Sequence, residues 1–224
     1  DFDTDFFEGT PFNLQQFGGP TDLSASDFES FIELYIAYFN RAPDAVGLNF
    51  WGTAFANGVS LADSARLFVD QVETRATYPS DLSNSELVAT IYDNVLGRIP
   101  DQAGFDFWVN ALDTGGIGRD IAILGILGGA KADPPADATQ DFIDQQLVDR
   151  AYLATKTDIG AYFAVHRGMS DVDNAATAMA VFNGSAESVT AAVAQIDSFY
   201  DAALNPTSGE FLMPLVGVLD DPFA

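Results

Sequence analysis

A short motif occurs twice in this chain, and both tryptophans of the protein belong to it. The two copies share an arginine, a proline, an aspartate, a glycine, a phenylalanine and a tryptophan at matching positions. These residues are Arg41, Pro43, Asp44, Gly47, Phe50 and Trp51 in the first copy, and Arg98, Pro100, Asp101, Gly104, Phe107 and Trp108 in the second. Self-similarity at a fixed period is typical of repeat architectures. We therefore expect a duplicated helix–turn–helix unit.

Each motif follows a segment whose apolar residues recur at helical spacing. They are Phe31, Leu34, Tyr35, Tyr38 and Phe39 before the first motif, and Val88, Ile91, Tyr92, Val95 and Leu96 before the second. Helix starts are marked by serines, with a capping-box pattern at residues 60–63 and 83–86. Helix ends are expected at glycines, namely Gly58, Gly97, Gly115, Gly128–Gly129, Gly168 and Gly184.

These patterns predict an all-α protein, an array of about eight or nine helices built on two helical-hairpin repeats plus a C-terminal helical subdomain. Residues 211–219 come nearest to a strand, but Pro214 and Gly217 weaken that assignment. The expected organisation is an irregular N-terminal segment at 1–23, a two-repeat domain at 24–130, a helical subdomain at 131–204 and an irregular tail at 205–224.

Every motif position has a structural interpretation. The proline suits the first position of a helix, and the aspartate suits its positively polarised first turn. The glycine allows another helix to approach closely. The phenylalanine and the tryptophan are expected to anchor the core. The arginine is expected to cap the preceding helix or to pair with the aspartate of the motif.

The charge excludes two classes of partner. The chain has 33 acidic residues against 9 Lys and Arg, which gives a net charge of −24. Binding to nucleic acid or to an anionic membrane needs clustered basic residues, so neither is expected. The acidic residues form either a solvated coat suited to high salt or, in part, a set of calcium ligands. The chain lacks cysteine, which excludes disulfides and thiolate metal sites, and no apolar run is long enough to insert in a membrane.

Few residues suggest site chemistry. Asp1, Asp3, Asp5 and Glu8 have the alternation of a calcium loop, although Phe6 and Phe12 replace the glycine and the terminal acid of an EF-hand. The single histidine, His166, has no Gly-x-Ser-x-Gly elbow to accompany it and suits a helix end. Asp171 and Asp173 precede a helix and suit its cap better than a metal. No catalytic residues are predicted.

The sequence Arg-x-Pro-Asp-x-x-Gly-x-x-aromatic-Trp, after a tyrosine-containing helix, resembles the repeat of bacterial domain of unknown function 4214. The resemblance covers residues 28–130, and residues 154–165 resemble the segment that commonly follows such repeats. It implies a secreted RTX-type or surface-layer-like protein, exported by type I secretion without a cleaved leader. The apolar and acidic ending at 211–224 is similar to the tails of such substrates, but the chain lacks the Gly-Gly-x-Gly-x-Asp nonapeptides.

We therefore expect a non-enzymatic surface or adhesive module outside the cell. It would form a homo-oligomer or larger assembly, or bind cell-surface polysaccharide, with calcium as candidate cofactor and as the bridge to any anionic sugar. Two alternatives stay open at this stage. One is a phage virion component such as a tail or fibre protein, and the other is a glycan-active enzyme.

Overall fold

A computed structural model describes residues 23–224 of the protein, and all regular structure in that range is helical. The elements are α1 (Ala25–Phe39), α2 (Ala45–Ala56), α3 (Leu61–Val69), α4 (Val72–Thr77), α5 (Asn84–Leu96), α6 (Gln102–Asp113), α7 (Arg119–Lys131), α8 (Gln140–Ala161), the π-helix η4 (Tyr162–His166), α9 (Val172–Val181) and α10 (Ala186–Ala203). The predicted all-α class is confirmed. The helices outnumber the expected eight or nine because segments as short as the six-residue α4 show no clear period.

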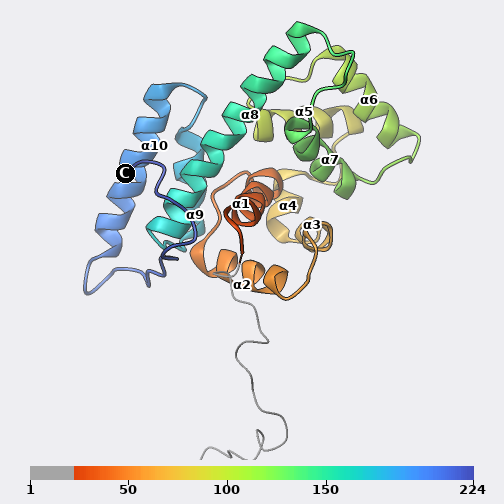
Figure 1. Ribbon diagram of the computed structural model, residues 1–224. Coiled ribbons are helices and arrows are strands. Elements are labelled where there is room, and N and C mark those ends of the chain that lie inside the picture. The colour runs from red at the N-terminus through yellow and green to blue at the C-terminus, as the bar shows by residue number, and fades with distance from the viewer. Residues whose placement is uncertain (1–22) are drawn as a thin grey trace, which may run out of the picture.

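The two motif copies give two three-helix units, α1–α3 and α5–α7, joined through α4. Helix α1 lies at the centre of the molecule and packs against α2, α3, α4, α5, α7 and α8 (Figure 1). It can do so because it is buried on nearly every side, from Phe28 to Tyr38. A helix that is apolar all round belongs in the interior rather than at a surface.

The long helix α8 crosses from the second unit to the C-terminal helices, as Figure 1 shows. It contacts α1, α5 and α7 on one side, and α9, α10 and η4 on the other. The segment after α10 folds back, where the amides of Met213 and Leu215 donate hydrogen bonds to the carbonyls of Gly168 and Val165. Residues 23–224 contain no helix long and apolar enough to span a membrane.

The predicted helix starts are confirmed at serines. The capping box predicted at 83–86 is confirmed, whereas at 60–63 the Ser60 side chain caps α3 by accepting from the Asp63 amide, without the reciprocal bond of a box. Ser185 caps α10, and Ser24, which was not predicted as a cap, forms a full capping box at the start of α1. Asp171 caps α9, where its carboxylate accepts a hydrogen bond from the Asn174 amide.

The start of the motif helix differs from the prediction by one or two residues. Asp44 and Asp101 are the N-caps of α2 and α6 rather than first-turn residues. Their carboxylates accept hydrogen bonds from the amides of Gly47 (2.7 Å) and Gly104 (2.9 Å). Pro43 and Pro100 therefore lie just outside the helix. The aspartate takes the cap because its side-chain oxygen satisfies an otherwise unpaired amide of the first turn.

The predicted helix end at Gly128–Gly129 is wrong, because α7 continues through both glycines to Lys131. Helix-ending glycines such as Gly97 and Gly115 have positive φ, whereas these two do not. Ile126, Leu127 and Ala130 are buried around the pair, so tertiary packing outweighs the low helix propensity of glycine.

The two units fall out of register by a single position after the motif. Gly58 and Gly115, which both have positive φ, keep the separation of the two motifs. The N-caps of the next helices, Ser60 and Gly118, are one position further apart than that. The buried residues of α3 and α7 are separated by the same distance along the chain as these two N-caps. They are Ser64, Ala65 and Phe68 in α3, and Ala122, Ile123 and Ile126 in α7. The turn of the second unit is therefore longer by a single residue, and Phe68 corresponds to Ile126.

Candidate functional site

The motif glycine makes the same close contact in both units. A Cβ atom added to Gly47 would collide with the hydroxyl of Tyr35, and one added to Gly104 would lie 2.7 Å from the hydroxyl of Tyr92. The two tyrosines occupy equivalent positions of the repeat and belong to the preceding helices α1 and α5. The expected close approach is therefore confirmed, and its partner is a tyrosine side chain rather than a helix backbone.

The motif arginine pairs with the aspartate of its own motif, as expected, and with a second acid from a later helix. Arg41 donates to Glu73 of α4 at 2.6 and 2.9 Å and lies 3.4 Å from Asp44. Arg98 donates to both carboxylate oxygens of Asp149 in α8, each at 2.7 Å, and lies 3.8 Å from Asp101.

The two units differ in which member of the ion pair is the more buried one. In the first unit the arginine is buried, and the Glu73 side chain is 45% exposed. In the second unit the Asp149 side chain is only 6% exposed, and the Arg98 side chain is 22% exposed. The hydrogen bonds to Asp149 raise the pKa of Arg98, so the guanidinium stays charged. The carboxylate of Asp149 is thus held in a largely buried place by one guanidinium and by the side-chain amide of Gln145, which donates to it at 2.9 Å.

The prediction that both aromatic residues of the motif anchor the core is wrong for the phenylalanine. Phe50 is 64% exposed and Phe107 is 63% exposed, whereas Trp51 and Trp108 are half-buried against the core. Each phenylalanine ring lies edge-on to its neighbouring tryptophan, at 5.2 and 5.1 Å between centroids. Consecutive helix residues point about 100° apart, and in α2 and α6 the tryptophan faces the core while the phenylalanine points toward solvent.

Aromatic rings fill the space beneath the motif in the first unit. Phe68 of α3 is fully buried, and its ring centroid lies 5.2 Å from that of Tyr35, 4.9 Å from Phe39 and 5.1 Å from Trp51. Arg41 lies over the rings of Tyr35 and Phe39 at 5.2 and 5.3 Å. The contacts of Phe68 with Tyr35 and Trp51 are edge-on and the one with Phe39 is tilted, and such aromatic contacts add to the stabilisation from burial.

The corresponding space in the second unit is an open cavity of about 570 Å³. Leu96 takes the place of Phe39, and Ile126 takes the place of Phe68, so two phenyl rings are missing. Trp108 packs closely on Gly125 of α7, where an added Cβ would lie 2.6 Å from the indole. The cavity has the volume of a small-molecule site, and such sites are lined mainly by apolar side chains with a few polar groups.

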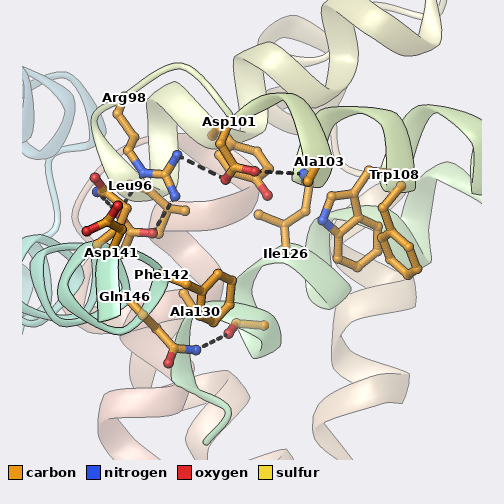
Figure 2. Close-up of a pocket in the computed structure, with 16 residues that line it drawn as sticks. Leu96, Arg98, Asp101, Ala103, Trp108, Ile126, Ala130, Asp141, Phe142 and Gln146 are labelled. Carbon is orange, nitrogen blue, oxygen red and sulfur yellow. Dashed lines mark hydrogen bonds and ion pairs between the residues drawn. The ribbon is translucent and has the colours of Figure 1, made fainter. Parts of the chain in front are cut away.

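Helix α8 supplies the opposite wall of this cavity. The lining residues from α8 are Asp141, Phe142, Gln145, Gln146 and Asp149. In Figure 2, Phe142 and Trp108 lie on either side of Ile126, with Arg98 and Asp101 above. Gln146 is held in place because its amide donates to the carbonyls of Gly129 and Ala132. Phe107 and Phe142 remain exposed and border the opening.

The remaining predicted chemistry lies elsewhere. Asp1, Asp3, Asp5 and Glu8 fall outside the described residues. Within 23–224 no group of three or more His, Asp or Glu side chains is arranged to hold a metal ion. His166 ends η4, and its Nε2 atom is buried without a hydrogen-bond partner in that part of the chain. A second cavity of about 520 Å³ lies between the units, beside Tyr78 and Arg119.

Sequence reasoning found Arg98, Asp101, Gly104, Phe107 and Trp108, and all five line the cavity. It missed Tyr92, Leu96 and Ile126, although extending the comparison of the two repeats outward would have shown that Phe39 is replaced by leucine. The α8 residues carry no repeat signal, because the first unit has no equivalent helix.

Residues 65–132 match the model of DUF4214, a domain of unknown function. The match begins within α3 and ends just after α7, so it includes the whole second unit, whereas α8 lies beyond it. The resemblance given by the motif is thus confirmed for these residues. No curated protein and no solved structure matches the chain.

Proposed function

We propose that this chain is a non-enzymatic binding module of an exported or surface-located protein, and that its second unit holds a saccharide of a cell-surface polysaccharide. The observation that carries the proposal is the contrast between the units. In the first unit the space beneath the motif is filled by the protein's own aromatic rings. In the second unit the corresponding space is open, beside Trp108 and Phe142. The net charge of −24 accords with a well-solvated, exposed surface.

The lining of the cavity supports a sugar more than a purely apolar ligand. A sugar ring has an apolar C–H face, which packs on aromatic side chains, and hydroxyls at its edge, which hydrogen-bond to carboxylates and amides. Both kinds of group are present. Trp108 and Phe142 supply apolar surface, and Asp101, Gln145 and Asp149 supply polar atoms. Polar groups placed among apolar ones fix the orientation of a ligand and give specificity.

The proposal is tested by blocking the cavity from its rim. Ala103 lines the cavity and is exposed, so Ala103→Trp fills the opening without disturbing the core. Val46 is the equivalent exposed residue of the first unit, and Val46→Trp is the matched control. Binding to immobilised cell-surface polysaccharides is measured by surface plasmon resonance, and circular dichroism checks the fold. We expect Ala103→Trp to abolish binding and Val46→Trp to leave it unchanged. Undiminished binding by Ala103→Trp would overturn the proposal.

Self-association and a calcium site in residues 1–8 stay predictions. Sedimentation velocity with calcium and with a chelator measures self-association and whether it depends on calcium. A calcium-dependent oligomer would add a second mode of attachment to the one proposed for the cavity.

A further inference from the structure

The cavity of the second unit carries an excess of negative charge. Three carboxylates line it, those of Asp101, Asp141 and Asp149, against the single guanidinium of Arg98. Arg98 is bound to Asp149 through both carboxylate oxygens, so this pair neutralises itself. Asp101 uses one oxygen to accept from the Gly104 amide, and Asp141 is exposed in the first turn of α8. Arg98 also lies 3.8 Å from Asp101, so one guanidinium is shared between two acids, and the three carboxylates leave the lining with an excess of two negative charges.

Aromatic side chains accompany these carboxylates on both walls. Tyr92, Phe107 and Trp108 come from α5 and α6, and Phe142 comes from α8. The face of an aromatic ring is electronegative and attracts a cation placed over it. Arg98 already shows this contact, since its guanidinium lies 5.3 Å from the centroid of Tyr92. Rings and carboxylates together form the kind of lining that holds an ammonium group.

Both units place the motif arginine over the tyrosine of the preceding helix, and the first unit adds a second ring. Arg41 is buried over both Tyr35 and Phe39 and is paired with Glu73. In the second unit Leu96 replaces Phe39, so Arg98 has one ring instead of two. The space beside it is open, and Phe142 and Asp141 reach it from α8. Arg98 is the counterpart of Arg41, so the second unit lacks two phenyl rings and not its arginine. The ring of a ligand would fill that space, and a positive charge on it would meet the excess of carboxylates in the lining.

We infer that the cavity of the second unit binds a sugar that carries a free ammonium group, with its ring on Trp108 and Phe142 and its charge toward Asp101 and Asp141. This inference rests on the proposed function and names the class of saccharide. It also gives a direction of selectivity, because the same carboxylates repel uronic acids and other anionic sugars.

The test compares three sugar oligomers of equal length by isothermal titration calorimetry at mildly acid pH. Oligoglucosamine carries ammonium groups, its N-acetylated form is neutral, and oligogalacturonate is anionic. We expect oligoglucosamine to bind about tenfold more tightly than the neutral oligomer, with no measurable binding of the anionic one. A tetralysine peptide serves as a cationic probe without a sugar ring.

Charge variants locate the effect. In Asp101→Asn plus Asp141→Asn the preference for the ammonium form should fall to about twofold or less, since the charge is lost while asparagine keeps the α6 cap. The control with the same change in net charge is Asp173→Asn plus Glu187→Gln on α9 and α10, which Figure 1 shows on the far side of α8. This control should keep the preference unchanged.

The outcomes separate the two claims. Equal or tighter binding of the neutral oligomer, still blocked by Ala103→Trp, overturns the ammonium assignment and leaves the proposed function standing. Binding of tetralysine as tight as that of oligoglucosamine overturns the assignment to a sugar. Failure of all three sugars to bind, or binding that Ala103→Trp does not affect, overturns the proposed function itself.

Discussion

The first and second units begin with the same motif and end with different interiors. In the first unit Phe68 and Phe39 close the space beneath Trp51, and the acid that pairs with the motif arginine comes from α4, directly after that unit. In the second unit Ile126 and Leu96 leave that space open, and the pairing acid comes from α8. The interior of the first unit is filled by its own side chains. The interior of the second unit contains an open cavity, and helix α8 supplies one of its walls.

A repeat motif can therefore specify a backbone without specifying whether the space beneath it is filled. The aspartate cap and the contact between glycine and tyrosine recur in both units. They fix the angle between the motif helix and the helix before it. The residues that decide whether the space beneath is filled lie outside the motif. Duplication of such a unit therefore allows one copy to have a filled interior while the other keeps an open cavity.

The substitution that should destabilise the protein most removes a ring from the filled interior of the first unit. Phe68→Ala should lower the free energy of unfolding by about 4 kcal/mol, because it removes a fully buried ring and its aromatic contacts. The matched change Ile126→Ala should lower it by about 2 kcal/mol, because Ile126 already borders a cavity and loses fewer contacts. Urea denaturation measures both, with the m-value as a check on two-state behaviour. Equal losses would mean that the two interiors are packed alike.

A smaller loss of stability is expected when the ion pairs are broken, and its size should depend on which member of each pair is buried. Arg98→Met should lower the free energy of unfolding by about 3 kcal/mol, because Asp149 is left charged in a largely buried place. Arg41→Met should lower it by about 1 kcal/mol although Arg41 is the more buried base, because Glu73 is 45% exposed and regains water. Thermal and urea unfolding of the two variants give the comparison. The opposite order would show that the burial of the arginine governs the stability of the pair.

The smallest effect concerns Lys156 of α8, which links the two units. Its ammonium donates to the carbonyl of Asn94 in the second unit at 2.6 Å and to the side chain of Asn40 in the first at 3.2 Å. Burial lowers the pKa of Lys156 from 10.5 to about 8. Between these values the unfolded chain binds more protons than the folded one, so stability rises with pH.

The expected rise from about pH 8 to about pH 10 is on the order of 2 kcal/mol. Above that range the tyrosines oppose it, because burial raises the pKa of Tyr35, Tyr38 and Tyr78, and the unfolded chain then loses protons first. Urea titrations at several pH values measure the slope. In Lys156→Met the slope should vanish, and a slope that persisted would assign it to other groups.

Much of the fold was predictable from local signals. Serine caps, positive-φ glycines and the helical periods of α1 and α5 act within a few residues, so the sequence contains them in full. Gly128–Gly129 failed as a helix end because burial of Ile126 and Ala130 decides the matter, and burial depends on distant helices. Phe50 and Phe107 failed as core residues because composition does not show which of two adjacent aromatics faces inward.

The candidate site was only half predictable for a related reason. The wall of the cavity formed by α5 and α6 includes the motif residues. Phe142 and Asp149 belong to α8, which is not part of the repeat. Their place follows from how α8 packs across both units, which is a long-range result of the whole fold.

The course of α8 also has a mechanical consequence. This helix of 22 residues is about 33 Å long and is tied to the second unit at Asp149, to both units at Lys156 and to the C-terminal helices beyond. A pulling force applied between a ligand held in the cavity and the C-terminal end of the chain would run along α8. The ties would then be loaded in shear and would have to break together rather than one after another. If the chain attaches through this cavity, as proposed, such a geometry would resist detachment under force better than its equilibrium stability alone would indicate.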